Sequence, residues 1–163
     1  MAEPWLRGPM EGVDALIAPV LRSLEQTRED LEQHTSGLST DQIWAQPQGF
    51  APLGFQLRHI AGSIERLLTY AEGGQLSEQQ MAALKAEMTP GPNREELLAA
   101  IDAAIAGVES MIRRTPVTEL SAPRGVGRKM LPTTVIGLLV HIAEHTQRHV
   151  GEAIVMAKLA RLV

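Results

Sequence analysis

Four long segments of this 163-residue sequence repeat apolar residues at the three-to-four-residue spacing of an amphipathic helix. They cover about 13–34, 52–72, 94–113 and 134–159, the last beginning at 133 or 134. Gly73 and Gly74 end the second segment, and Asn93 precedes the third as an N-cap, with Glu95 and Glu96 in the first turn. Because four such helices bury their apolar faces against one another, we expect an all-α four-helix bundle.

Two shorter helices are expected in the connections. Ser39 to Gln42 and Ser77 to Gln80 both have the S-x-x-Q form of a capping box, and the helices that follow hold 43–44 and 81–87. No stretch alternates β-branched residues convincingly over the length of a strand, and the nearest, 133–136, leads into helical spacing. We therefore expect one helical domain over 1–163, in which 1–11 form an N-terminal extension.

The composition argues against several classes of protein. The chain has no cysteine, which rules out disulfides, thiolate metal ligands and a cysteine nucleophile. Its formal net charge of −4 and pI of about 5.7 argue against nucleic-acid binding. The N-terminus lacks a signal-peptide pattern, and no apolar run approaches about 18 residues. A cytoplasmic protein without a membrane partner is the resulting expectation.

Three of the five histidines are crowded into the last helical segment. His145 and His149 are four residues apart, which places both on one helix face, and neutral imidazole is the commonest protein ligand for first-row transition metals. At about 100° per residue, both rings point towards the bundle, whereas His141 lies on the polar margin. His59 lies at the edge of the apolar stripe of the second segment. We expect His59, His145 and His149 to form a metal site in a cleft between two helices.

Two other interpretations of these histidines remain open. A lone helical histidine is more often a surface or core residue than a metal ligand. In this interpretation the chain is a purely structural dimer whose histidines are surface residues. In addition, His141-Ile142-Ala143-Glu144-His145 matches H-x-x-E-H, a zinc-protease signature whose glutamate is the general base. However, His141 and Glu144 turn away from the apolar face. Only 18 residues follow His145, which leaves little chain for another ligand and a substrate-binding domain.

Three longer motifs extend over most of the chain. They are LSTDQIWAQP at 38–47, QLRHIAG at 56–62 and HTQRHVGEAI at 145–154. Together they resemble the DinB/YfiT-like family of metal-dependent hydrolases and thiol transferases, whose pattern H-x-x-x-H-x-G-Q-I is similar to the third motif. The resemblance implies an up-down-down-up four-helix bundle with one divalent metal on His59, His145 and His149. Glu152 stands where the family usually has glutamine, and we expect it and His141 to lie around the site or to be solvated.

The resemblance implies an enzyme, either a hydrolase or a transferase that uses a low-molecular-weight thiol such as bacillithiol, mycothiol or glutathione. No general base is apparent beside the histidines, because Glu65 points away from His59, and this slightly favours thiol transfer. Zinc is the expected metal, with nickel, manganese, iron or copper as alternatives. Arg124 and Arg128 precede the last helix and are candidates for docking an acidic small-molecule substrate, the alternative being a solvated loop.

The main functional alternative is a non-catalytic bundle. Such a protein binds a small molecule or a partner, for example under stress, and its metal site is structural or vestigial. A homodimer is compatible with each of these functions, since many helical bundles pair through a helix face. The individual catalytic residues, the substrate and the metal are not specified by these patterns.

Overall fold

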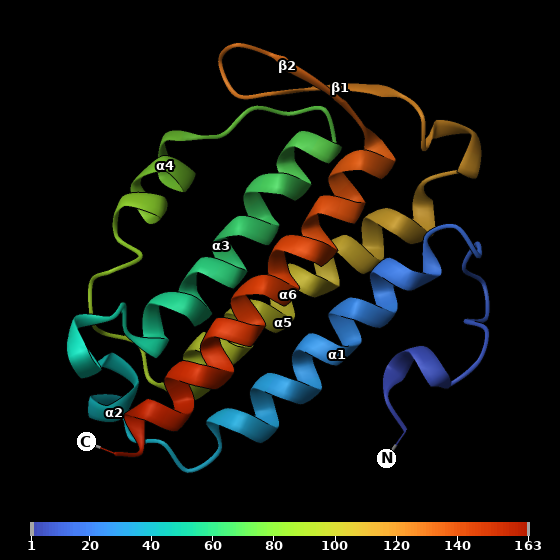
Figure 1. Cartoon of the computed structure of the whole chain (residues 1–163). Coiled ribbons are helices and arrows are strands. Elements are labelled where there is room, and N and C mark those ends of the chain that lie inside the picture. Colours follow the sequence, from blue (N-terminus) through green and yellow to red (C-terminus); the bar gives the residue numbers. More distant parts are fainter. Residues whose placement is uncertain (1, 163) are drawn as a thin grey trace.

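The computed structural model describes residues 2–162 and confirms the four long helices (Figure 1). They are α1 (Ala18–Thr35), α3 (Leu53–Ala71), α5 (Arg94–Arg114) and α6 (Val135–Ala160). The short helices are α2 (Thr40–Trp44) and α4 (Glu78–Lys85), and 3-10 turns occupy Pro4–Leu6, Pro47–Gly49 and Val117–Glu119. α1 begins later than the apolar spacing predicts, because Pro19 occupies its first turn, where the missing N–H is tolerated.

The long helices are arranged in up-down-down-up order, as the family resemblance implies. α1 and α6 run in one direction along the bundle, and α3 and α5 run in the other (Figure 1). α6 packs between α1 and α3, and α5 packs against the same two helices. Because α3 and α5 are parallel, the chain between them must return along the bundle. This connection carries α4 past α3, which becomes important at the candidate site.

The predicted capping boxes are present in the structure. The side chains of Ser39 and Ser77 each accept a hydrogen bond from the backbone N–H three residues later, and Gln42 and Gln80 accept from the backbone of the cap. Asn93 caps α5 in the same reciprocal way. These bonds satisfy backbone donors that have no partner within the helix, so helix starts can be read from local sequence.

The expectation that the chain lacks strands is wrong. β1 (Pro123–Val126) and β2 (Leu131–Thr134) form an antiparallel hairpin between α5 and α6. Each strand has only four residues, and proline and glycine interrupt any alternation, so neither strand is recognisable without its partner. Thr134 ends β2 and caps α6, because its side chain accepts a hydrogen bond from the N–H of Gly137.

The core lies between the four long helices and is aliphatic. α2 closes one end of it, where Trp44 packs against Gly54 in the first turn of α3. A Cβ atom added to Gly54 would lie 2.7 Å from the Trp44 ring. The indole N–H of Trp44 also donates to the carbonyl of Pro92, 2.8 Å away. Fully buried side chains of the core include Leu24, Leu31, Leu57, Ile60, Ile64, Ile101, Ile105, Val108, Leu139 and Ile142.

Replacing Gly54 with alanine is expected to lower the free energy of unfolding by about 1–2 kcal/mol, because the added methyl group overlaps the indole ring. Gly151 in α6 is the matched control. It is exposed, and nothing lies within 4 Å of its added Cβ, so alanine there should raise stability by about 0.5–1 kcal/mol. Urea unfolding of the metal-free variants measures both changes. Equal effects at the two positions would contradict the close contact with Trp44.

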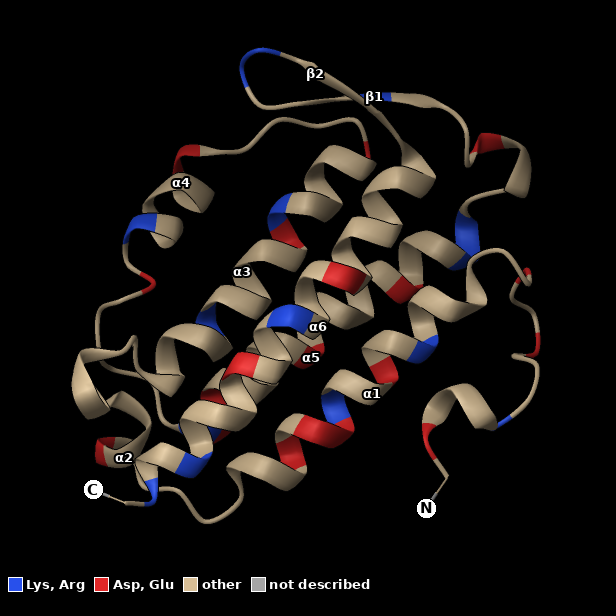
Figure 2. Cartoon of the chain, viewed as in Figure 1, with Lys and Arg blue, Asp and Glu red and all other residues tan. Residues whose placement is uncertain are grey.

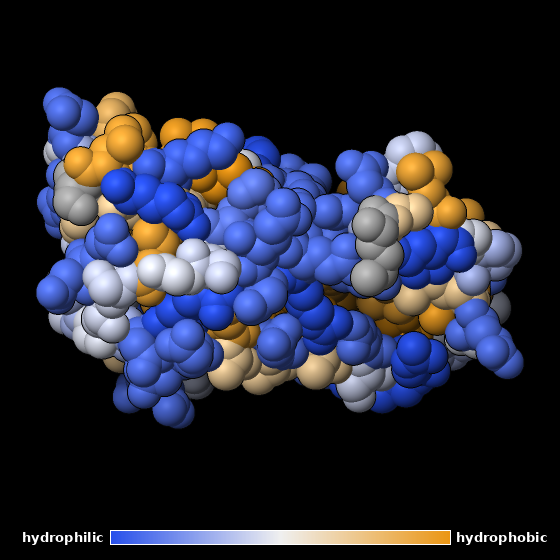
Figure 3. Space-filling view, turned by 90° about the horizontal axis from the view of Figure 1, so that it is seen from below, coloured by the Kyte–Doolittle hydropathy of each residue, from blue (hydrophilic) through white to orange (hydrophobic). Residues whose placement is uncertain are grey.

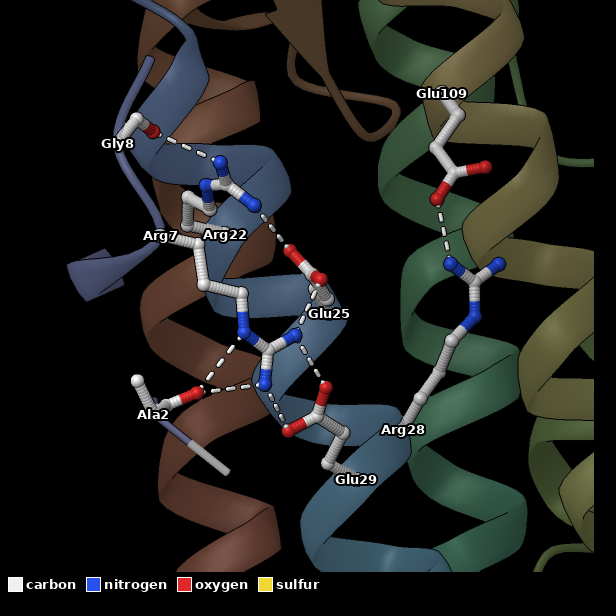
Figure 4. A network of polar contacts seen from close by, with 8 residues as sticks. All are labelled: Ala2, Arg7, Gly8, Arg22, Glu25, Arg28, Glu29 and Glu109. Atoms are coloured by element: carbon white, nitrogen blue, oxygen red, sulfur yellow. Dashed lines mark hydrogen bonds and ion pairs between the residues drawn. The ribbon is translucent and has the colours of Figure 1, made fainter. Parts of the chain in front are cut away.

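The N-terminal segment is attached to α1 by ion pairs. The Arg7 guanidinium donates to Glu25 at 2.7 Å and to Glu29 at 2.6 Å, while its other N–H groups bond the carbonyl of Ala2 (Figure 4). A separate contact joins α1 to α5, where Arg28 donates to Glu109 (Figure 4). The Arg7 pairs are at least partly exposed, so they orient the N-terminal segment more than they stabilise the fold.

Figure 3 shows the face of the molecule that lies below in Figure 1. Polar residues cover most of this face, and the more apolar residues gather mainly towards its two ends. Acidic and basic positions alternate along α6 (Figure 2). Within residues 2–162, no helix is both long enough and apolar enough to cross a bilayer.

Candidate metal centre

Three imidazoles converge where α3 and α6 pack side by side. His59 comes from α3, and His145 and His149 come from successive turns of α6. The Nε2 atoms of His59 and His145 are 3.1 Å apart, and one ring nitrogen of each histidine lies within 4.8 Å of those of the other two. All three side chains are partly buried. The structure therefore brings together the three histidines predicted from helix angles, close enough to bind one ion.

The donor set fits a small divalent cation. Nitrogen ligands about 2.0–2.1 Å from a tetrahedral zinc ion are roughly 3.3–3.4 Å apart, close to the separation of the His59 and His145 nitrogens. Burial, followed by the neighbouring histidines, lowers the pKa of His145 to about 4. Burial also lowers the pKa of His149, with His59 contributing. Both rings are therefore neutral at pH 7, the state that ligates metal.

The Nδ1 atom of His59, which faces away from the other two histidines, is hydrogen-bonded to a carboxylate. Glu87 Oε2 lies 2.7 Å from His59 Nδ1, and Glu87 Oε1 lies 2.9 Å from a guanidinium nitrogen of Arg66. Burial alone would raise the pKa of Glu87, but the hydrogen bond from His59 and the charge of Arg66 outweigh it and lower that pKa. An ionised carboxylate can only accept, so His59 carries its hydrogen on Nδ1 and points the Nε2 lone pair inward.

The Nδ1 atom of His149 is hydrogen-bonded to a side-chain amide. Gln56 Oε1 lies 2.7 Å from His149 Nδ1, and Gln56 Nε2 donates to Glu152 Oε2 at 2.8 Å. The second bond fixes the orientation of the amide, because only its nitrogen can donate to a carboxylate. Glu152, which departs from the family pattern, thus acts on His149 through Gln56. Its own Oε2 lies 3.8 Å from His149 Nδ1.

His145 differs from the other two histidines. Its Nδ1 atom lies 3.3 Å from Arg148, which can only donate, so in this contact the hydrogen of His145 is on Nε2 and faces His59. Binding a cation through this Nε2 requires the hydrogen to move to Nδ1 and the Arg148 contact to break. The Arg148 side chain is 62% exposed and can move into solvent.

The remaining predicted site residues lie outside this cluster. His141 is exposed and pairs with Glu144 at 2.7 Å, so these two residues of the H-x-x-E-H motif face solvent and its His145 alone joins the cluster, with the His141 and His145 ring centroids 5.4 Å apart. Arg124 donates to the carbonyl of Ala71 at the end of α3, and Arg128 lies in the turn of the β1–β2 hairpin. That hairpin adjoins the start of α6, about 15 Å along the helix from His145. The two arginines are not brought to the histidines.

Sequence reasoning missed Glu87, Arg66 and Gln56. Gln56 precedes His59 by three residues, a spacing that places both on one helix face and could have suggested the contact. Glu87 lies 28 residues after His59, beyond the end of α4, and no local pattern indicates that it returns to α3. Glu87 thus places a carboxylate beside His59 that sequence reasoning did not identify, and both of its oxygens are already engaged by partners.

An apolar groove of about 440 Å³ adjoins this cluster, between α6 and the segment that precedes α3. Gln56 and Glu152, which together hold His149, form its polar wall. Its size lies within the range of small-molecule sites. The apolar lining consists of Phe50, Ala51, Val155, Met156 and Leu159.

Comparison with known proteins gives a family and similar folds among solved structures. A model of the DinB superfamily matches residues 23–153. A crystal structure described as that of a conserved protein from Enterococcus faecalis superposes with a TM-score of 0.73, covering 89% of this chain and 96% of that one. The two sequences are 14% identical, so this likeness concerns the fold. No curated protein matches the chain.

Proposed function

This chain belongs to the DinB superfamily, and we propose that it is a divalent-metal-dependent enzyme whose ligands are His59, His145 and His149. The convergence of three imidazole nitrogens from two helices is the observation that carries the proposal. When bound, a divalent metal with three neutral ligands supplies a Lewis acid with an open position, which lowers the pKa of a coordinated thiol or water. Zinc suits this role and an all-imidazole donor set, with nickel, manganese and iron as alternatives.

Thiol transfer is the reaction that the surrounding carboxylates favour. Glu87 is 4% exposed and engaged by His59 and Arg66, so it is not free to deprotonate a water molecule, and the Oε2 atom of Glu152 is already engaged by the Gln56 amide. A thiol held at the three histidines would need no further base, because a bound metal would lower its pKa: its proton would pass to solvent, its sulfur would form the new carbon–sulfur bond, and the leaving group would depart from that carbon. We therefore propose a low-molecular-weight-thiol S-transferase.

The apolar groove is the proposed position of the electrophilic substrate. Its lining suits an aliphatic or aromatic group, and Gln56 at its wall links it directly to His149. A small molecule in the groove would displace water from apolar side chains beside the histidines. The residues that hold His149 would in this way also set the edge of the substrate site.

The test is conjugation by protein purified without an affinity tag and loaded with zinc, nickel, manganese or iron(II). Glutathione, mycothiol and bacillithiol are offered separately with the electrophile 1-chloro-2,4-dinitrobenzene. We expect metal-dependent thioether formation that His149→Ala abolishes. His34→Ala is the matched control, because His34 lies in the last turn of α1 and should leave the rate unchanged.

Two outcomes would contradict thiol transfer. Hydrolysis of 4-nitrophenyl acetate without thiol conjugation would assign the site to hydrolysis instead. If the metal-loaded protein shows neither reaction, while His149→Ala lowers its melting temperature, the alternative of a structural metal site in a non-catalytic bundle holds.

A further inference from the structure

We propose that Glu87 is a positioning residue: it orients the His59 ring for metal binding and couples the metal centre to the α3–α5 crossover, the segment 72–93 that connects α3 to α5. The inference rests on the proposed metal site and concerns a residue outside the three ligands. Glu87 lies in this crossover, after α4 and before α5, and 28 residues separate it from His59, the histidine that it contacts. Its carboxylate is 2.7 Å from His59 Nδ1, on the side of the ring opposite the cluster.

The contact selects one tautomer of His59. Because the carboxylate of Glu87 accepts the Nδ1 hydrogen, Nε2 keeps the lone pair that a metal requires and points it at His145. Without an acceptor at Nδ1, the ring could carry its hydrogen on either nitrogen and turn about its χ2 bond. A carboxylate behind a metal-binding histidine fixes the ring orientation and increases the basicity of the ligand nitrogen.

The protein provides a fitted space for this carboxylate. Arg66, about two turns after His59 on α3, pairs with the other oxygen of Glu87 at 2.9 Å. Gly62 lies beneath the pair: an added Cβ atom would be 2.7 Å from a nitrogen of Arg66 and 3.0 Å from Glu87 Oε1. Arg58 donates to the carbonyls of Ala86 and Thr89, at 2.6 Å each, and so holds the backbone on both sides of Glu87.

The rest of the crossover has few contacts that would hold it. Every residue of α4 is at least partly exposed, whereas Glu87 is 4% exposed. Burying an ion pair is weak evidence for stability, so the arrangement is better explained by its effect on His59. A cation on Nε2 makes Nδ1–H a stronger donor to Glu87. Metal binding and docking of the crossover therefore favour each other, since coupling between two sites is reciprocal.

Zinc affinity, measured by competition with a chromophoric chelator, tests the positioning role. Glu87→Ala should weaken binding by about 10–100-fold, the range found for groups that orient metal ligands. Glu87→Gln should recover part of this loss, because its amide oxygen can still accept from Nδ1. Glu109→Ala is the matched control: it removes a carboxylate that pairs with an arginine, Arg28 on α1, away from His59, and should change the affinity by less than about 3-fold.

The double variant Glu87→Ala/Arg66→Met guards against misfolding from an unpaired buried arginine, and it should bind zinc as weakly as Glu87→Ala. Hydrogen exchange of residues 78–90 tests the coupling. Zinc should slow exchange in the parent protein and leave it unchanged in Glu87→Ala. Unchanged affinity in Glu87→Ala would overturn the inference, and so would an equal loss in Glu109→Ala, because the effect would then not be specific to the contact with His59.

The metal-free protein separates failure of this inference from failure of the proposed function. Nitrogen-15 NMR should show His59 as the Nδ1–H tautomer in the parent and as a mixture in Glu87→Ala. If the parent binds no metal, the proposed function fails and the metal coupling fails with it. A tautomer preference that is lost in Glu87→Ala would even then support the role of Glu87 in orienting His59. An unchanged tautomer in the variant overturns that hold whether or not metal binds.

Discussion

His149→Ala, His145→Ala and His59→Ala are each expected to weaken zinc binding by at least about 100-fold. Structural zinc sites with four ligands bind with about 10–16 kcal/mol, so one ligand contributes about 3 kcal/mol, or roughly two powers of ten in affinity. The three histidines come from two helices that pack together without metal, and the bundle should stay folded in each variant. Isothermal titration, or competition with a chelator for tight binding, measures the change, and circular dichroism checks the fold.

His141→Ala is the matched control for this series. His141 lies on the same helix, one turn before His145, but its ring is exposed and paired with Glu144. We expect its removal to leave zinc affinity within a few-fold of the parent value. A loss as large as that of His149→Ala would instead support a site built on the H-x-x-E-H motif and would contradict the cluster centred on His59.

Zinc is expected to stabilise the whole bundle strongly. An ion that binds only the folded chain, at about 1,000 times its dissociation constant, adds about 4.1 kcal/mol to the free energy of unfolding. For a domain of this size, about 2–4 °C per kcal/mol converts this gain into a rise in melting temperature of roughly 8–16 °C. Differential scanning calorimetry with and without zinc measures the rise, and excess chelator should reverse it.

The same titration on His149→Ala shows whether the stabilisation arises at the cluster. The variant should show little or no rise at the same zinc concentration, because it keeps two of the three ligands. A rise as large as that of the parent would mean that zinc binds elsewhere, for example at the acidic groups along the exposed side of α6. Such a result would remove the physical basis of the proposed enzyme.

Local sequence was sufficient to identify the helices and the face of each helix on which the histidines lie. The capping boxes at Ser39, Ser77 and Asn93 mark helix starts through hydrogen bonds that span only three residues. The spacing of His145 and His149 places both rings on one face, because the period of an α-helix is set by the backbone. These features depend on neighbours in the chain, and a single sequence therefore reveals them.

Contacts between distant segments decided the rest. The packing of α3 against α6 brings His59 within 3.1 Å of His145, 86 residues later, and helix angles alone do not specify this neighbour. The β1–β2 hairpin was missed because its strands are defined by each other and not by their own residues. The Glu87 contact was missed because it depends on the return path of the crossover, since register between segments follows from packing of the whole chain and not from local spacing.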